Sequence, residues 1–103
     1  MSYHEVCLML TYSFNKVEGH LGFLELDGEL SSDTIAKLQE ALYVALNNAE
    51  HVVINLGNVT KIDSACSELL EKVHIYAKRL KKVMTIRGLR HQFGDNLQQL
   101  SVV

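Results

Sequence analysis

Apolar residues recur at two different spacings along this chain, and the two spacings alternate in chain order. Residues 5–14 and 21–27 alternate between two faces in the manner of β-strands, and the polar segment 15–20 predicts a turn that joins them into an antiparallel hairpin. Residues 51–56 and 83–86 are short apolar runs with β-branched residues, each followed closely by a glycine. These runs predict two further strands, the first of them buried.

Between and after these strands, apolar residues recur at steps of three and four, which predicts helices. The first helix follows a cluster of capping residues at 31–34 and runs to about Asn48; the second begins at Ser64, and a third covers about residues 91–100. The expected inward-facing residues of the first two helices are Ile35, Leu38, Leu42, Ala45, Leu46, Ala49, Cys66, Leu69, Leu70, Val73, Tyr76, Ala77 and Leu80. Those of the third are Phe93, Leu97 and Leu100.

The resulting order is β-β-α-β-α-β-α. Helical crossovers between strands of one sheet are nearly always right-handed and make those strands parallel. The pattern therefore predicts an α/β fold with a four-stranded mixed sheet and helices mainly on one face. A chain of 103 residues suits a single domain, expected to span residues 1–103.

The net charge is −2, but it is unevenly distributed. Residues 1–60 carry two lysines and eight acids, and residues 61–103 carry eight basic groups and four acids, so the halves are −6 and +4. The whole-chain charge argues against a nucleic-acid-binding domain and suits a protein partner with its own charge pattern. The basic cluster at 78–82 could bind RNA or an anionic membrane, although a solvated helix end is the more usual role for such a cluster.

Other patterns argue against several classes of protein. Two cysteines, Cys7 and Cys66, are too few for a disulfide framework, and there is neither a signal-peptide pattern nor an apolar run near the roughly 20 residues of a membrane span. The five histidines are scattered, and phosphate-binding glycine loops and hydrolase motifs are absent from the sequence. We therefore expect a cytoplasmic protein without metal or cofactor, without membrane insertion and without enzymatic activity.

The segment that follows the predicted strand at 51–56 carries the most specific signal. Asp63 and Ser64 stand where a helix begins, close to the carboxyl end of a buried strand, which is where ligands bind in parallel sheets. A phosphate on Ser64 would meet unpaired helix N–H groups and the positive pole of the helix, so the fold would tolerate it while the surface potential changed. From the residues alone, a helix-capping role is the alternative for Ser64, whereas Asp63 is expected to cap the helix under either interpretation.

The chain resembles the STAS domain of bacterial anti-sigma factor antagonists, with a SpoIIAA-like fold. The resemblance rests on residues 24–30, 52–56, 59–64 and 83–89, and its most specific element is the Asp63–Ser64 pair. In that family a serine at this place is phosphorylated by an anti-sigma serine kinase, and the unmodified form binds that kinase and frees the sigma factor. The resemblance thus implies a partner-switching regulator of transcription with Ser64 as phosphoacceptor. The implied partner-binding residues are Thr60, Asp63, Ser64, Ser31, Asp33, Cys66 and Ser67.

Three alternatives stay open. The family usually has small residues and glycines after the serine, whereas this chain has Ala65, Cys66, Ser67 and Glu68. An accessory subunit of a lipid-transport ABC system, which would bind its ATPase without phosphorylation, also fits. The second alternative concerns Cys66, which lies near a helix N-terminus and could be a redox-sensing thiol or simply a small buried residue. The third alternative is a small enzyme that uses Ser64 or Cys66. Homodimer formation is compatible with each of them.

Overall fold

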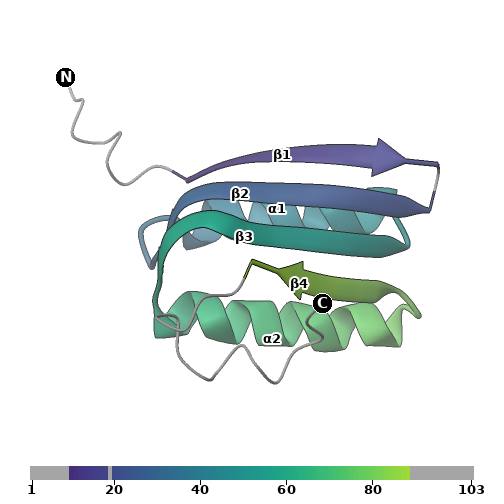
Figure 1. Ribbon diagram of the computed structural model, residues 1–103. Helices are drawn as coiled ribbons and strands as arrows, with labels where there is room; N and C mark the ends of the chain where they lie inside the picture. The colour runs from purple at the N-terminus through teal and green to yellow at the C-terminus, as the bar shows by residue number, and fades with distance from the viewer. Residues whose placement is uncertain (1–9, 19, 89–103) are drawn as a thin grey trace.

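The structure is a computed structural model, which describes residues 10–18 and 20–88. Its elements are β1 (Leu10–Val17), β2 (Leu21–Leu30), α1 (Ile35–Asn48), β3 (His51–Ile62), α2 (Ser64–Arg79) and β4 (Val83–Arg87) (Figure 1). The predicted helix at about 91–100, Cys7 and the first residues of the predicted first strand lie outside the described residues.

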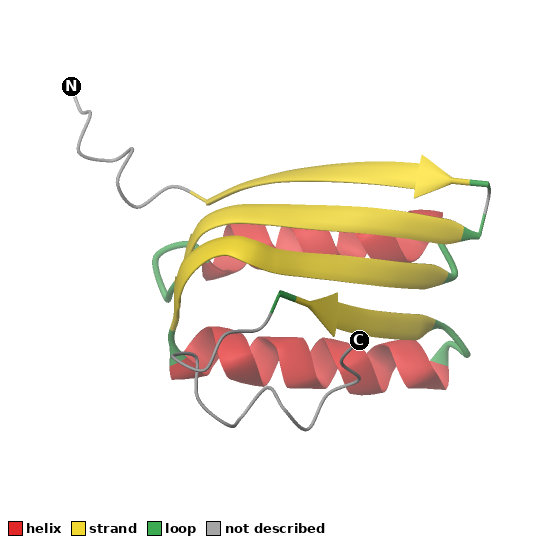
Figure 2. Cartoon of the chain, viewed as in Figure 1, coloured by secondary structure: helices red, strands yellow, loops and turns green. Residues whose placement is uncertain are grey.

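The four strands form one sheet in the order β1-β2-β3-β4 (Figure 2). β1 pairs with β2 in antiparallel register, and β2 with β3 and β3 with β4 in parallel register. The α/β class and the four-stranded mixed sheet predicted from the sequence are thus confirmed. Because β2 and β3 are parallel and Leu30 pairs with Ile62, the loops that follow these two strands begin side by side.

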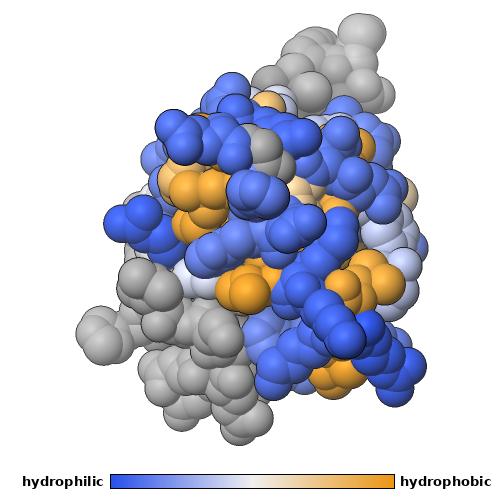
Figure 3. Space-filling model, turned by 90° about the vertical axis from the view of Figure 1, so that its right-hand side faces the viewer, coloured by the Kyte–Doolittle hydropathy of each residue, from blue (hydrophilic) through white to orange (hydrophobic). Residues whose placement is uncertain are grey.

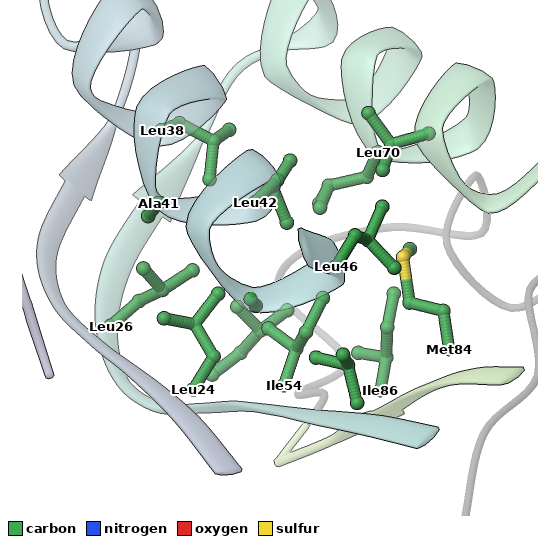
Figure 4. Close-up of a cluster of buried hydrophobic side chains, with 14 of the residues drawn as sticks. Leu24, Leu26, Leu38, Ala41, Leu42, Leu46, Ile54, Leu70, Met84 and Ile86 are labelled. Atoms are coloured by element: carbon green, nitrogen blue, oxygen red, sulfur yellow. The ribbon is translucent and has the colours of Figure 1, made fainter. Parts of the chain in front are cut away.

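Helices α1 and α2 lie together over one face of the sheet, and the core fills the space between (Figure 4). Alternate strand residues point into it, among them Leu24 and Ile54, neither of which is exposed to solvent. Helix α1 contributes Leu42 and helix α2 contributes Leu70 to the same cluster. The burial of these large side chains fixes α2 against the sheet and thereby fixes the position of its first residue.

Two strands are longer than the periodicity indicates. β1 continues to Val17, so the turn to β2 is shorter than expected. β3 continues to Ile62, and beyond Asn55 it pairs only with β2, because β4 ends at Arg87. The register of β2 and β3 shifts twice along this extension, and such irregularities bend a strand and interrupt its period of two.

The inward face of α2 is narrower than predicted. Cys66, Leu70, Val73 and Ala77 are buried and Leu69 is partly buried, as expected. Tyr76 and Leu80, however, are exposed, so their assignment to the inner face was wrong. The apolar spacing is broad enough to include them, but α2 packs over the edge of the sheet, where β4 has only five residues, and the sheet covers a single strip of the helix.

A lysine side chain joins the C-terminal end of α1 to the turn between α2 and β4. The Lys82 ammonium donates hydrogen bonds to the carbonyl oxygens of Leu46 and Ala49. Carbonyls at a helix C-terminus lack intrahelical donors and form the negative pole of the helix, so a cation is well placed there. The α1 helix itself carries no basic residue in its last turn, and Lys82 supplies that charge from elsewhere in the chain.

Candidate functional site

Asp63 is the N-cap of α2. Its backbone is extended, with φ −94° and ψ 175°, and its Oδ1 accepts a hydrogen bond of 3.0 Å from the backbone N–H of Cys66. An acceptor at this position satisfies one of the helix N–H groups that have no intrahelical partner. The capping role expected of Asp63 from the sequence is therefore confirmed.

The second carboxylate oxygen of Asp63 reaches a different loop. Oδ2 accepts a hydrogen bond of 2.9 Å from the backbone N–H of Ser32, and the N–H of Asp63 donates to the carbonyl of Leu30 at 2.9 Å. One aspartate thus holds the start of α2 and the loop 31–34 together. This role of Ser32 was not predicted, because a backbone N–H donor is the same in every residue except proline and carries no sequence signal.

These contacts lower the pKa of the Asp63 carboxyl. The hydrogen bond from the Cys66 N–H is the largest cause, the bond from Ser32 and the charge of Lys61 act in the same direction, and partial burial opposes them. The side chain is therefore ionised at neutral pH. A fixed negative charge lies directly beside Ser64.

Replacing Asp63 by alanine should lower the free energy of unfolding at neutral pH by about 1–3 kcal/mol, because both a helix cap and a charge-assisted bond to Ser32 are lost. Folding lowers the pKa of Asp63, so its stabilisation is complete above the ordinary value of 3.8 and disappears as the pH falls through the folded-state pKa. Urea unfolding at neutral pH and at about pH 3 measures both effects. An undiminished difference between the two proteins in acid would contradict the assignment.

Ser64 is the first residue of α2, and it is exposed to solvent. The backbone N–H groups of Cys66 and Ser67 are bonded to Asp63, so the first turn is ordered. The positive pole of a helix of this length lies at its N-terminus and favours an anion there. The hydroxyl of Ser64 is thus presented to solvent beside a carboxylate and at the positive end of a helix.

The loop 31–34 contributes differently from the expectation. Thr34 is the N-cap of α1, but its hydroxyl makes no capping bond; instead it accepts from the N–H of Ser31 at 3.0 Å and lies 2.8 Å from the carbonyl of Glu29. Ser31 is buried, whereas Ser32 and Asp33 are exposed. Of the two residues predicted here to contact a partner, only Asp33 lies at the surface.

Cys66 and Ser67 are also buried, so their side chains lie beneath the surface on which the sequence analysis placed them. The sulfur of Cys66 donates to the carbonyl of Ser31 at 3.4 Å. Burial, together with the nearby charge of Asp63, raises the pKa of the Cys66 thiol to about 12. The thiol is therefore protonated at neutral pH, which argues against a reactive or redox-sensing cysteine. These two residues lie on the buried face of α2, at the N-terminal end of its apolar strip, so their side chains point toward the core.

Thr60 lies on the extension of β3, is exposed, and donates from its hydroxyl to the carbonyl of Gly28 at 3.2 Å. Glu68 is exposed one helical turn beyond Ser64. We call the group of Ser32, Asp33, Thr60, Asp63, Ser64 and Glu68 the Ser64 surface. It carries three carboxylates, so its charge suits a basic partner surface.

Within residues 10–18 and 20–88, no three His, Cys, Asp or Glu side chains come together in a way that could hold a metal ion. No helix in that part of the chain is long and apolar enough to cross a membrane.

A family model described as "Mlab, STAS domain" matches residues 15–102. The chain belongs to the STAS domain family. This places the Asp63–Ser64 junction, which the sequence resemblance selected, inside a STAS domain that spans most of the chain. A search of the curated proteins found no match.

Solved structures show the same fold. An anti-sigma factor antagonist from Mycobacterium paratuberculosis is similar with a TM-score of 0.78 at 13% identity, covering 91% of this chain and 85% of that one. The unphosphorylated form of the anti-sigma factor antagonist SpoIIAA has a TM-score of 0.67 at 13% identity, covering 90% and 87%. The phosphorylated form of SpoIIAA from Bacillus has a TM-score of 0.65 at 12% identity, covering 90% and 91%. At these identities the comparison shows the fold of this STAS domain.

Proposed function

We propose that this STAS domain is an anti-sigma factor antagonist that binds an anti-sigma serine kinase through the Ser64 surface, and that phosphorylation of Ser64 releases the kinase. The observation that carries the proposal is the exposed hydroxyl of the first residue of α2, beside an ionised N-cap. Support also comes from SpoIIAA, an anti-sigma factor antagonist of similar fold that exists in phosphorylated and unphosphorylated forms.

The mechanism is electrostatic. A phosphate adds a charge of about −1.5 to −2 at neutral pH. Its oxygens would lie at the positive end of α2, which stabilises the modified serine without rearranging the core. The carboxylates of Asp63 and Glu68 are already present on the Ser64 surface, so the added charge concentrates negative potential at one point. A partner that fits the unmodified surface closely would then meet an unpaired dianion, and burying such a charge is unfavourable.

The catalytic work belongs to the kinase, which would use ATP and transfer the γ-phosphoryl group to Ser64. This domain supplies the acceptor hydroxyl and its position, and no catalytic role is proposed for its own residues. The buried, protonated Cys66 thiol supports that division.

The test combines the purified domain with ATP and the anti-sigma serine kinase encoded nearest to it. We expect one added phosphate, located at Ser64 by peptide mass spectrometry, and no phosphate on the Ser64→Ala variant. Ser64→Asp should weaken kinase binding by roughly tenfold or more, since a charge that must be desolvated costs more than 1.4 kcal/mol.

Ser32→Ala is the matched control, because Ser32 is an exposed serine of the same surface whose contact to Asp63 uses only its backbone. That variant should receive the same single phosphate at Ser64 as the original domain. Phosphate at another residue, or equal kinase affinity for Ser64→Asp and the original protein, would rule out the switch.

A second candidate is an accessory subunit of a lipid-transport ABC system that binds its ATPase through the same surface. It is favoured by the run from Ala65 to Glu68, which differs from the antagonist pattern and puts an exposed carboxylate one turn from Ser64. Affinity purification from the native cell separates the two functions. An ATPase with a permease supports the subunit, and a kinase with a sigma factor supports the antagonist.

A further inference from the structure

The C-terminal half of α2 and the turn into β4 are strongly basic. The twelve residues from Lys72 to Val83 contain five cations and no acid. The cations are Lys72, Lys78, Arg79, Lys81 and Lys82. All are exposed except Lys82, whose ammonium is bonded to the end of α1, so four positive charges face solvent.

The same stretch also exposes apolar side chains. Of the six large exposed hydrophobic residues within the described ranges, four lie between residues 75 and 83. They are Ile75, Tyr76, Leu80 and Val83, with exposed fractions of 54%, 46%, 44% and 50%. Figure 3 views the end of the molecule to which this region belongs, and there apolar patches alternate with hydrophilic side chains. We call the four cations and these four residues the α2 C-terminal surface.

Cations and apolar side chains are intermixed on this surface. Ile75 lies three and four positions before Lys78 and Arg79, so these side chains are neighbours on the helix. Lys81 has φ 60°, a left-handed conformation that ends the helical segment and turns the chain into β4. Leu80 and Val83 therefore flank one tight turn that carries Lys81 at its centre.

We propose that the α2 C-terminal surface binds the surface of an anionic lipid bilayer. Lysine ammonium groups interact with acidic headgroups while Ile, Leu and Val side chains enter the boundary of the acyl region, and Tyr is favoured at that depth. A protein partner fits less well, because lysine is depleted in protein interfaces and three of these four exposed cations are lysines. RNA fits less well too, because phosphate contacts make no use of exposed Ile75, Leu80 and Val83.

The position of this surface makes it independent of the function proposed above. Helix α2 has 16 residues, which corresponds to a length of about 24 Å, so Ser64 lies at one end of it and the α2 C-terminal surface extends from Lys72 at its middle to the other end (Figure 1). A domain bound to a bilayer by one end of α2 would keep Ser64 accessible at the other. The inference therefore adds a membrane-binding site and does not rest on the choice of protein partner.

The test measures co-sedimentation of the domain with phosphatidylcholine vesicles that contain or lack phosphatidylglycerol. We expect binding only to the anionic vesicles, strongest at low salt, because the screening length falls from about 30 Å at 0.01 M to about 8 Å at 0.15 M. Each lysine near an anionic surface changes partitioning roughly fivefold, so the Lys78→Gln/Lys81→Gln double variant should bind about 25-fold more weakly. Ile75→Ser/Leu80→Ser should also weaken binding, since it removes apolar contact without changing charge.

Lys61→Gln is the matched control, because Lys61 is an exposed lysine on β3 near the opposite end of α2. It should bind vesicles like the original protein. Thermal unfolding of each variant shows whether its fold is intact, and kinase binding should be unchanged by the two double variants. Equal binding to both kinds of vesicle, equal losses in Lys61→Gln and the double variant, or retention by single-stranded RNA in place of vesicles would each overturn the proposal.

Discussion

Replacing Leu70 by alanine should lower the free energy of unfolding by about 2–5 kcal/mol. Leu70 has no solvent-exposed surface and is a buried anchor of α2 in the core, so truncation leaves a cavity that the surrounding side chains fill only in part (Figure 4). Because α2 positions Ser64, loss of this anchor should also weaken the proposed kinase binding under conditions in which the variant is partly unfolded. Urea unfolding followed by circular dichroism measures the stability.

The neighbouring leucine provides the control. Leu69 lies on the same helix and is only partly buried, so Leu69→Ala removes the same atoms but leaves a site open to water. We expect a loss of about 1 kcal/mol, close to the transfer free energy of the part of the removed side chain that had been shielded from water. Equal losses for the two variants would show that α2 does not pack against the sheet through Leu70.

Gly88→Ala should lower the free energy of unfolding by a similarly large amount, about 2–5 kcal/mol, for two additive reasons. Gly88 has φ 81°, a conformation that side chains with a Cβ atom rarely adopt. A Cβ atom there would also lie 2.6 Å from the backbone nitrogen of Gly57 and 3.0 Å from its Cα. Backbone atoms cannot rotate away, so the end of β4 or the bend of β3 would have to move.

Gly57→Ala tests this explanation within the same contact. A Cβ atom at Gly57 would lie 3.1 Å from Oδ1 of Asn55, which belongs to a side chain and can shift, and Gly57 has no positive φ. We expect a loss of at most about 1.5 kcal/mol, mainly from disturbing the hydrogen bond that the Gly57 N–H donates to Asn55. Thermal unfolding shows which of the two variants is less stable. A Gly57→Ala variant less stable than Gly88→Ala would contradict this explanation.

The fold could be predicted from the sequence because periodicity reports directly on which side chains are buried. Leu24 and Leu26, for example, alternate with exposed Glu25 and Asp27, and the structure confirms the strand. The extension of β3 was missed because its register shifts interrupt that alternation near Gly57 and Asn58. Tyr76 was misplaced because spacing shows which residues share a helix face but not how much of that face the sheet covers.

The candidate site was predictable in part. Asp63 as N-cap follows from residue preference and position, and its bond to the Cys66 N–H confirms it. The link to Ser32 depends on parallel pairing of β2 with β3, which brings two loops together although 31 positions separate them in the chain. Burial of Ser31 and Ser67 depends on the same three-dimensional arrangement. These contacts and burials can be known only once the positions of the strands in the sheet are known.

The order of the strands across the sheet is also their order along the chain, and this has a consequence for biosynthesis. Each strand can join the one that emerged from the ribosome just before it, so the sheet can grow in one direction without waiting for a distant segment. Asp63 and its partner Ser32 are both synthesised before α2 is complete. Ser64 therefore reaches its final setting after β2 and β3 have emerged, when α2 packs down on strands that are already paired.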